Sequence, residues 1–200
     1  MDKEIDVLKP FEEILEPDSR QKAFVILNRE TLQYRERTLK DHYSAIKEIE
    51  LSTSVPEKIR KHFDTARNLL LYSWFVYRFI PVAEMHAFAS VEYALKEKSG
   101  KTDLMFKRLL RLAIEEKWIR DSGFKYFRLK GEQPEEQRSI AGDPDQRDVQ
   151  GYCKVLLDSL PYLRNELAHG SSMLYPGGLT TIAICADLIN QLFEPKKKRK

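Results

Sequence analysis

Arg164, Asn165 and His169 lie in one short stretch near the C-terminus, within the segment LPYLRNELAHG that covers residues 160–170. A guanidinium can stabilise the negative charge that builds on a phosphate during cleavage, and an imidazole can transfer protons near neutral pH. An amide beside them can orient the imidazole or hold a phosphate oxygen. Together these groups suit metal-free cleavage of RNA by its own 2'-OH, with Arg164 as charge stabiliser and His169 as proton-transfer group.

The segment is predicted to form a helix that begins behind Pro161 and ends before Gly170. At 100° per residue, His169 lies about 140° from Arg164 around the helix axis. The leucines fall at about 260° to 320° from the arginine and are predicted to face the core (Leu160, Leu163 and Leu167). One helix cannot aim both groups at one phosphate, whereas two antiparallel copies can. The mechanism therefore requires a homodimer.

The spacing of the two residues carries little weight by itself. An arginine followed by a histidine after four to six intervening residues is expected about once by chance in this composition, and it occurs three times. Arg35 and Arg37 both stand at that distance from His42, in a highly charged segment without a clean division of faces. These two pairs are set aside. The asparagine, the following Gly170 and the leucines distinguish the C-terminal pair.

That context resembles the HEPN superfamily, compact all-helical domains whose ribonuclease members carry an arginine, a polar residue that is often asparagine, and then a histidine. The resemblance covers roughly residues 55–194 and includes the segments AFASVEYALKEKSG, LMFKRLLRLAIEEKWI and TTIAICADLINQLF. It implies an HEPN-like up-and-down helical bundle, paired as a homodimer through the helix of residues 164–169, with RNA cut in a composite cleft. It also implies toxin or host-defence roles and an antitoxin or regulatory protein as partner.

Two further positions bear on this resemblance. Members paired with a nucleotidyltransferase antitoxin often carry tyrosine two residues after the histidine, where this chain has Ser171. Regulation by tyrosine modification is therefore not part of the expectation. Glu92 lies one step off a predicted apolar core stripe (Phe88, Val91 and Leu95). It is a candidate to orient Arg164 or His169, as acidic or polar residues do in some members. A solvated or salt-bridged Glu92 is an equally open interpretation.

The positive charge of the chain is concentrated in its tail. The sequence has 34 basic and 31 acidic residues, and five of the basic ones end the chain (Lys196, Lys197, Lys198, Arg199 and Lys200). The rest carries 29 basic against 31 acidic residues, so it is not a basic nucleic-acid-binding surface. The tail fits a solvated end, an expression tag, a nuclear import signal or an RNA-contacting arm. Any RNA contact through it should weaken with salt.

Several kinds of chemistry lack their sequence patterns. Four scattered histidines and two distant cysteines make no zinc motif, and no phosphate-binding glycine loop or serine-hydrolase elbow appears. No metal and no cofactor is predicted. Cys153 and Cys185 are expected to be free thiols in partly buried helices.

No membrane segment is expected. The most apolar run, residues 69–83, is interrupted by Arg78 and Pro81 and falls short of the roughly 20 residues that cross a bilayer. The acidic, mixed N-terminus does not resemble a secretory signal. We expect a cytoplasmic protein, or a nuclear one if the basic tail is a native import signal.

Helical patterns dominate the whole chain, which predicts an all-α fold. An N-terminal helical extension is expected over residues 1–50, with a short helix at 3–15 and a long one from Asp18 to about residue 49. The HEPN-like domain is expected over residues 51–194, followed by the basic tail at 195–200.

Within that domain, one helix should start near Ser54 and Pro56 and run through an aromatic cluster to Pro81. The cluster is predicted to be core (Tyr72, Trp74, Phe75, Tyr77 and Phe79). Further helices are expected over 82–98 and 103–117 and at the C-terminus. Residues 123–151 are predicted to form a loop that either shapes the cleft or has no function.

Two other classes of function stay open beside the nuclease. One is a catalytically inactive HEPN-like module that binds RNA or protein through the same polar face. The other is a regulatory subunit that binds its partner through the charged N-terminal segment. RNA cleavage that persists in EDTA favours the enzyme, and a monomer in solution argues against it.

Overall fold

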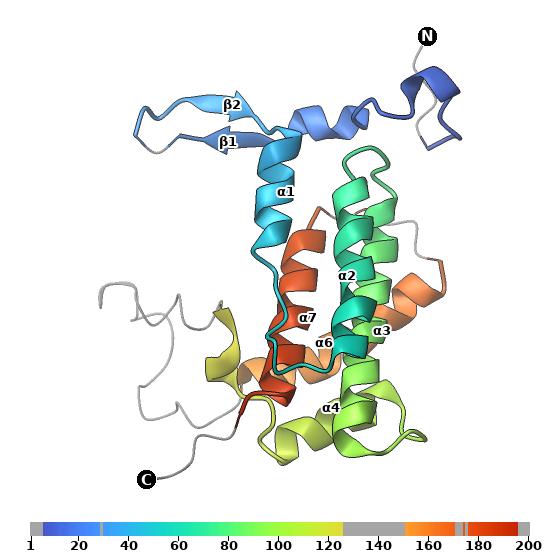
Figure 1. The fold of residues 1–200 in the computed structure, drawn as a ribbon, viewed down its shortest axis with the longest axis vertical. Helices are drawn as coiled ribbons and strands as arrows, with labels where there is room; N and C mark the ends of the chain where they lie inside the picture. The colour runs from blue at the N-terminus through green and yellow to red at the C-terminus, as the bar shows by residue number, and fades with distance from the viewer. Residues whose placement is uncertain (1–5, 29, 126–150, 171–173, 175, 196–200) are drawn as a thin grey trace.

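Figure 1 shows a bundle of helices with an N-terminal arm, formed by the described residues before Leu39, lying across one end of it. The structure is a computed structural model that describes residues 6–28, 30–125, 151–170, 174 and 176–195. Helix α1 (Leu39–Lys47) leads from the arm into the bundle. The bundle helices are α2 (Glu57–Tyr72), α3 (Phe79–Ser99), α4 (Phe106–Glu115), α6 (Gly151–Ala168) and α7 (Gly178–Leu192), with a 3-10 turn η3 (Asp121–Gly123) after α4. The described chain is mostly helical, as the sequence predicts.

Helix α3 is the centre of the bundle and contacts α2, α4, α6 and α7. Its sequence explains this position, because apolar residues lie on several sides of the helix and not on one stripe. Its alanines let neighbouring helices approach closely, while larger side chains fill the spaces between them. The predicted core stripe is confirmed, since each of its members is buried (Phe88, Val91 and Leu95).

The two cysteines lie where the sequence placed them. Cys153 on α6 and Cys185 on α7 are buried and unpaired. Burial raises the pKa of both thiols, because a thiolate would be poorly solvated there. Neither sulfur is therefore a candidate nucleophile.

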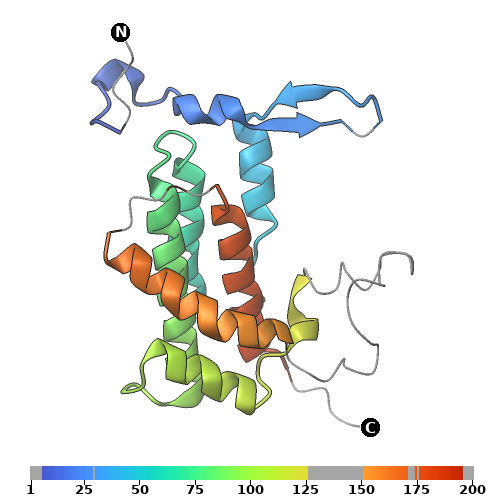
Figure 2. The same ribbon diagram turned by 180° about the vertical axis from the view of Figure 1, so that it is seen from behind.

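Helix α6 begins earlier than the sequence suggested. Figure 2 shows it running obliquely across the back of the bundle. It starts at Gly151, and Pro161 lies inside it, so the expected start behind that proline is wrong. A proline inside a helix removes one backbone hydrogen bond. Here Leu156 and Leu160 are buried around it, and their packing holds the helix together despite that loss.

The N-terminal arm corrects the largest error of the sequence analysis. The predicted helices over 3–15 and from Asp18 are absent from its described residues. Two 3-10 turns, η1 (Phe11–Glu13) and η2 (Ser19–Ala23), precede an antiparallel hairpin of β1 (Val25–Leu27) and β2 (Tyr34–Glu36). Only the last part of the long helix exists, as α1, which Thr38 and Asp41 open with a reciprocal capping box.

Local chemistry explains the hairpin. Val25 and Ile26 are β-branched and favour extended backbone. At the turn, the Asn28 side chain accepts hydrogen bonds from the backbone N–H groups of Glu30 and Thr31. Leu32 adopts a φ of 55°, which closes the turn and breaks any helix.

Polar contacts tie the arm to the bundle at the link between α2 and α3. The backbone N–H of Asp18 donates to the carbonyl of Trp74 at 2.9 Å, and its carboxylate accepts from the N–H of Tyr77 at 3.1 Å. The side chain of Gln21 donates to the Ser73 carbonyl. Helix α2 stops at Tyr72, before the expected end at Pro81, and this link follows it.

The aromatic cluster is core only in part. Trp74 and Tyr77 are buried, whereas Tyr72 is 55% and Phe79 is 36% exposed. The prediction that all five rings are core is therefore wrong for the two outer ones. Because the chain turns between α2 and α3, the rings cannot share one helical face.

No helix in the described part of the chain combines the length and the apolar character needed to span a bilayer. Most of the loop predicted over 123–151, and the basic residues Lys196–Lys200, lie outside the described residues. Their predicted roles stay predictions.

Candidate functional site at the end of α6

Helix α6 divides its residues differently from the prediction. Leu160 is buried and Leu167 half-buried, as expected, but Leu163 is 44% exposed and does not face the core. Cys153 and Leu156 complete the buried face. At 100° per residue Arg164 is only about 40° from Leu160, so the arginine continues the buried stripe and does not oppose it.

Arg164 can occupy this inner position because the Glu92 carboxylate on α3 contacts its guanidinium. Its Nη2 donates to Glu92 Oε2 at 3.4 Å, and the other carboxylate oxygen accepts from Lys96 Nζ at 2.8 Å. The Arg164 side chain is 41% exposed and that of Glu92 only 18%. The contact expected between Glu92 and the α6 arginine is present, although the long distance makes it a weak hydrogen bond.

Asn165 lies beside the same guanidinium. Its Oδ1 accepts from Arg164 Nη1 at 3.3 Å, and its side chain is otherwise exposed. Glu92 and Asn165 therefore contact Arg164 at two different nitrogens. The remaining N–H groups of this partly exposed guanidinium have no partner among the described residues and could bind an anion.

His169 stands apart from these three residues. It is exposed, and its backbone N–H donates to the Asn165 carbonyl at 2.9 Å in the last turn of the helix. Gly170 follows with a φ of 83°, the left-handed conformation that ends helices and favours glycine. Among the described residues no side chain bonds to the imidazole. We call Glu92, Arg164, Asn165 and His169 the α6 site.

The face of α6 that carries His169 also carries exposed apolar residues. Val155, Tyr162 and His169 recur every seven residues, so they share one side of the helix. Val155 is 60% and Tyr162 63% exposed, and Leu163 borders them. The sequence analysis missed this face, although the seven-residue spacing could have indicated it. Exposed apolar side chains grouped in this way are typical of protein interfaces.

The alternative pairs near the N-terminus have structural roles. Arg35 makes two hydrogen bonds to the Asp41 carboxylate, at 2.7 and 2.8 Å. His42 is buried and its Nε2 donates to the Leu70 carbonyl at 2.9 Å, while burial lowers the pKa of its imidazole. Neither arrangement offers an exposed arginine with an exposed histidine.

Metal chemistry finds no support in the described ranges, where no three histidine, cysteine or acidic side chains gather as potential ligands. Searches among protein-family models, curated proteins and solved structures find no match to this chain. The case for a function therefore depends on the residues of the α6 site and the surface around them.

Proposed function

We propose that the protein is a metal-independent endoribonuclease of the HEPN type, in which two copies of α6 form one composite cleft. The observation that carries the proposal is the arrangement at the end of α6. Glu92 and Asn165 hold Arg164 at its edge, and an exposed His169 follows on a face that also carries Val155 and Tyr162. The HEPN-like bundle is part of the proposal, because the helical fold alone does not specify it.

The proposed reaction needs no water and no metal. His169 accepts the proton of the RNA 2'-OH or donates one to the leaving 5'-oxygen. The 2'-oxygen forms a bond to phosphorus as the bond to the 5'-oxygen breaks, which leaves a 2',3'-cyclic phosphate and a 5'-OH. Arg164 stabilises the charge that builds on the phosphate, and Glu92 acts as its positioning residue.

The dimer follows from the geometry of one helix. Arg164 and His169 are about 7.5 Å apart along the axis of α6 and point about 140° apart around it. An antiparallel second α6 that approaches at the exposed Ala168, which points between Arg164 and His169, brings the histidine of one copy towards the arginine of the other. DNA lacks the 2'-OH and should survive.

The test incubates the full chain with RNA and with DNA of the same sequence in EDTA and analyses the product ends. We expect RNA fragments that end in a 2',3'-cyclic phosphate, and none from Arg164→Ala. The matched control is Arg111→Ala, because Arg111 is an exposed arginine on α4. Equal cleavage by both variants would refute the assignment.

A second experiment tests the dimer, because a variant that is monomeric but keeps the α6 site intact must lose cleavage. Ala168→Tyr places a large ring where the second helix must approach, whereas Lys154→Tyr places the same ring at an exposed position near the start of the same helix. In analytical ultracentrifugation we expect a dimer for the parent chain and Lys154→Tyr, and a monomer without activity for Ala168→Tyr. An active monomer would exclude the composite cleft.

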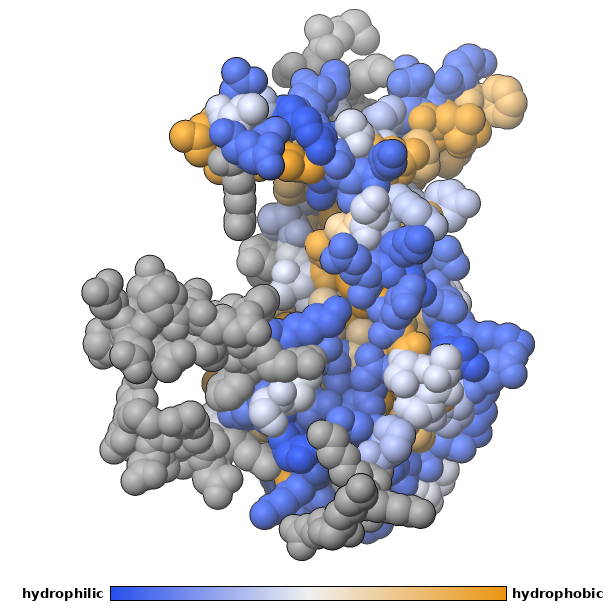
Figure 3. All heavy atoms as spheres, turned by 60° about the vertical axis from the view of Figure 1, so that its left-hand side comes forward, coloured by the Kyte–Doolittle hydropathy of each residue, from blue (hydrophilic) through white to orange (hydrophobic). Residues whose placement is uncertain are grey.

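We propose partner binding through the arm as a second candidate function, because the arm exposes an unusual amount of apolar surface. Figure 3 shows hydrophobic side chains gathered on it at the top of the molecule. Leu8 is 97%, Phe11 84% and Leu15 79% exposed. A partner protein that covers them would fit the alternative of a regulatory subunit that binds through its N-terminal segment. The absence of RNA cleavage, together with a partner lost on Phe11→Ser, would favour this function over the nuclease.

A further inference from the structure

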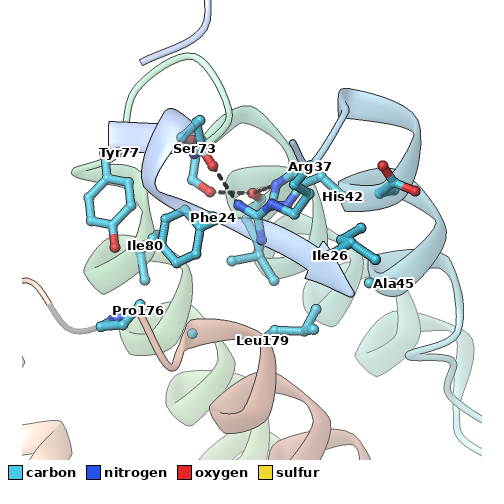
Figure 4. A pocket seen from close by; sticks show the side chains of 14 residues that line it. Phe24, Ile26, Arg37, His42, Ala45, Ser73, Tyr77, Ile80, Pro176 and Leu179 are labelled. Carbon is cyan, nitrogen blue, oxygen red and sulfur yellow. Dashed lines mark hydrogen bonds between the residues drawn. The ribbon is translucent and has the colours of Figure 1, made fainter. Parts of the chain in front are cut away.

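A pocket lies where the N-terminal arm meets the bundle, and none of the α6-site residues line it. Its volume is about 150 Å³, and we call it the joint pocket. Its apolar walls come from both parts of the molecule (Phe24, Ile26, Leu70, Ile80 and Leu179). Figure 4 shows Arg37 and His42 on one side of it and Pro176 and Leu179 on the opposite side.

Arg37 is the cation in the lining of this pocket. Its guanidinium lies 4.5 Å from the centre of the Phe24 ring and 5.7 Å from the Trp74 ring. Its Nη2 donates to Gln21 Oε1, but its Nε is buried and has no hydrogen-bond partner. A buried N–H without an acceptor is rare in proteins, so the hydrogen-bonding capacity of this guanidinium is only partly met by the described residues.

No acid of the described residues pairs with this cation. The nearest candidate, Asp41, also lines the pocket, but its two oxygens are engaged by Arg35 and Thr38. Burial lowers the pKa of Arg37 because the guanidinium has lost water, and the nearby Asp41 carboxylate offsets this loss only in part. The aromatic rings stabilise it only in part.

The charge that the pocket can neutralise is small. His42 is the other titratable base in its lining, and burial lowers the pKa of this imidazole, so it is neutral at physiological pH. Helix α7 begins at the pocket with Gly178 and has no side-chain cap at its N-terminus. Its positive end therefore adds to the field of Arg37. The lining suits one negative charge.

We propose that the joint pocket binds a small organic monocarboxylate, with the carboxylate on Arg37 and a compact apolar body between the arm and the bundle. A cavity of about 150 Å³ holds a benzene-sized molecule. The carboxylate supplies the counter-charge that the described acids do not provide. The site is independent of the proposed nuclease reaction.

Phosphate fits this pocket less well. A phosphate dianion needs several donors, whereas Arg37 is the one cation of the lining and Gln21 already occupies one of its nitrogens. Asp41 would also repel the second charge. The apolar walls, in contrast, gain from an apolar ligand body.

Binding should fasten the arm to the bundle, because the ligand touches both. A ligand that binds only the folded state raises the melting temperature as its concentration rises. The same ligand should slow amide exchange in the hairpin, since Phe24 and Ile26 would pack on it.

The test titrates the full chain by calorimetry with benzoate and 3-methylbutanoate, and with benzamide and inorganic phosphate as comparisons. We expect at least one carboxylate to bind, and benzamide and phosphate to bind at least about tenfold more weakly. Benzamide has the shape of benzoate without its charge. Failure of both carboxylates to bind would overturn the proposal, and so would equal affinity for benzamide or for phosphate.

Three variants locate the site. Arg37→Met should lose at least about tenfold in carboxylate affinity, while Arg111→Met, the matched control on α4, should keep it. Because Arg37→Met also removes the bond to Gln21, its fold is checked by circular dichroism. Ala45→Leu keeps Arg37 but fills the pocket, and should abolish binding in a stable chain. Undiminished binding by Ala45→Leu would place the ligand elsewhere and overturn the proposal.

Discussion

Arg37 and His42 have the same spacing as Arg164 and His169, but the first pair lies in the joint between arm and bundle and the second at the exposed end of α6. Arg37 is enclosed by two aromatic rings and has no paired acid among the described residues, and His42 is buried. Arg164 contacts Glu92 and is partly exposed, and His169 is exposed. The surroundings of an arginine and a histidine, and not their separation, decide what they can do.

The contrast predicts opposite effects when each histidine is removed. His169→Ala should lower RNA cleavage by about 10²- to 10⁴-fold, the usual contribution of a general acid or base. It should leave stability almost unchanged, because the side chain is exposed. Initial rates on a labelled RNA and thermal melts of the same preparation measure both. A His169→Ala chain with a lowered melting temperature and an unchanged cleavage rate would contradict this prediction.

His42→Ala should do the reverse. The substitution leaves the Leu70 carbonyl without its partner and removes a ring that lies 5.6 Å from that of Trp74. We expect a loss of about 1–3 kcal/mol in the free energy of unfolding. Cleavage per folded molecule should stay at the parent level. Urea denaturation gives the first quantity, and a rate normalised to the folded fraction gives the second.

The burial of His42 should also appear in the pH dependence of stability. Burial lowers the pKa of His42 below its ordinary value of 6.5, so the unfolded chain takes up this proton more readily than the folded one. The stability contributed by neutral His42 is present above pH 6.5 and is lost as the pH falls towards the lowered pKa. Urea titrations between about pH 5 and pH 8 should show that the free energy of unfolding falls less on acidification in His42→Gln than in the parent chain. An unchanged slope would contradict this.

The sequence predicted the bundle better than the arm for a physical reason. Buried apolar residues recur along α3 from Ile80 to Leu95, so the helical period was enough to place Phe88, Val91 and Leu95 in the core. The arm has only short elements, and its charged residues between 29 and 40 suit a solvated helix as well as a hairpin. The turn signal was present in Asn28, but a single asparagine does not outweigh a helical pattern until its side-chain bonds are known.

At the candidate site, the sequence predicted the residues but not their directions. The contact between Glu92 and α6 could be anticipated because Glu92 borders the core stripe of α3. The helical period predicted that Leu163 would face the core. Because α6 crosses the bundle at an angle, however, only Leu160 and Leu167 of the three predicted leucines pack against the core. The crossing angle depends on tertiary packing, which no single helix encodes. For the same reason the enclosure of Arg37 could not be predicted, since its rings come from Phe24 and Trp74.

The smallest expected effect comes from Glu92, because its hydrogen bond to Arg164 is long and 41% of the Arg164 side chain is exposed. Glu92→Gln keeps the shape of the side chain and removes its charge. We expect cleavage to fall only a few-fold, with a change in stability of at most about 1 kcal/mol. Glu97→Gln is the matched control, since Glu97 is also on α3 and pairs with Lys58 away from α6. If Glu92 positions the guanidinium, the loss in Glu92→Gln should appear in kcat more than in KM. A purely structural role of Glu92 would instead lower the melting temperature of this variant without changing its cleavage rate.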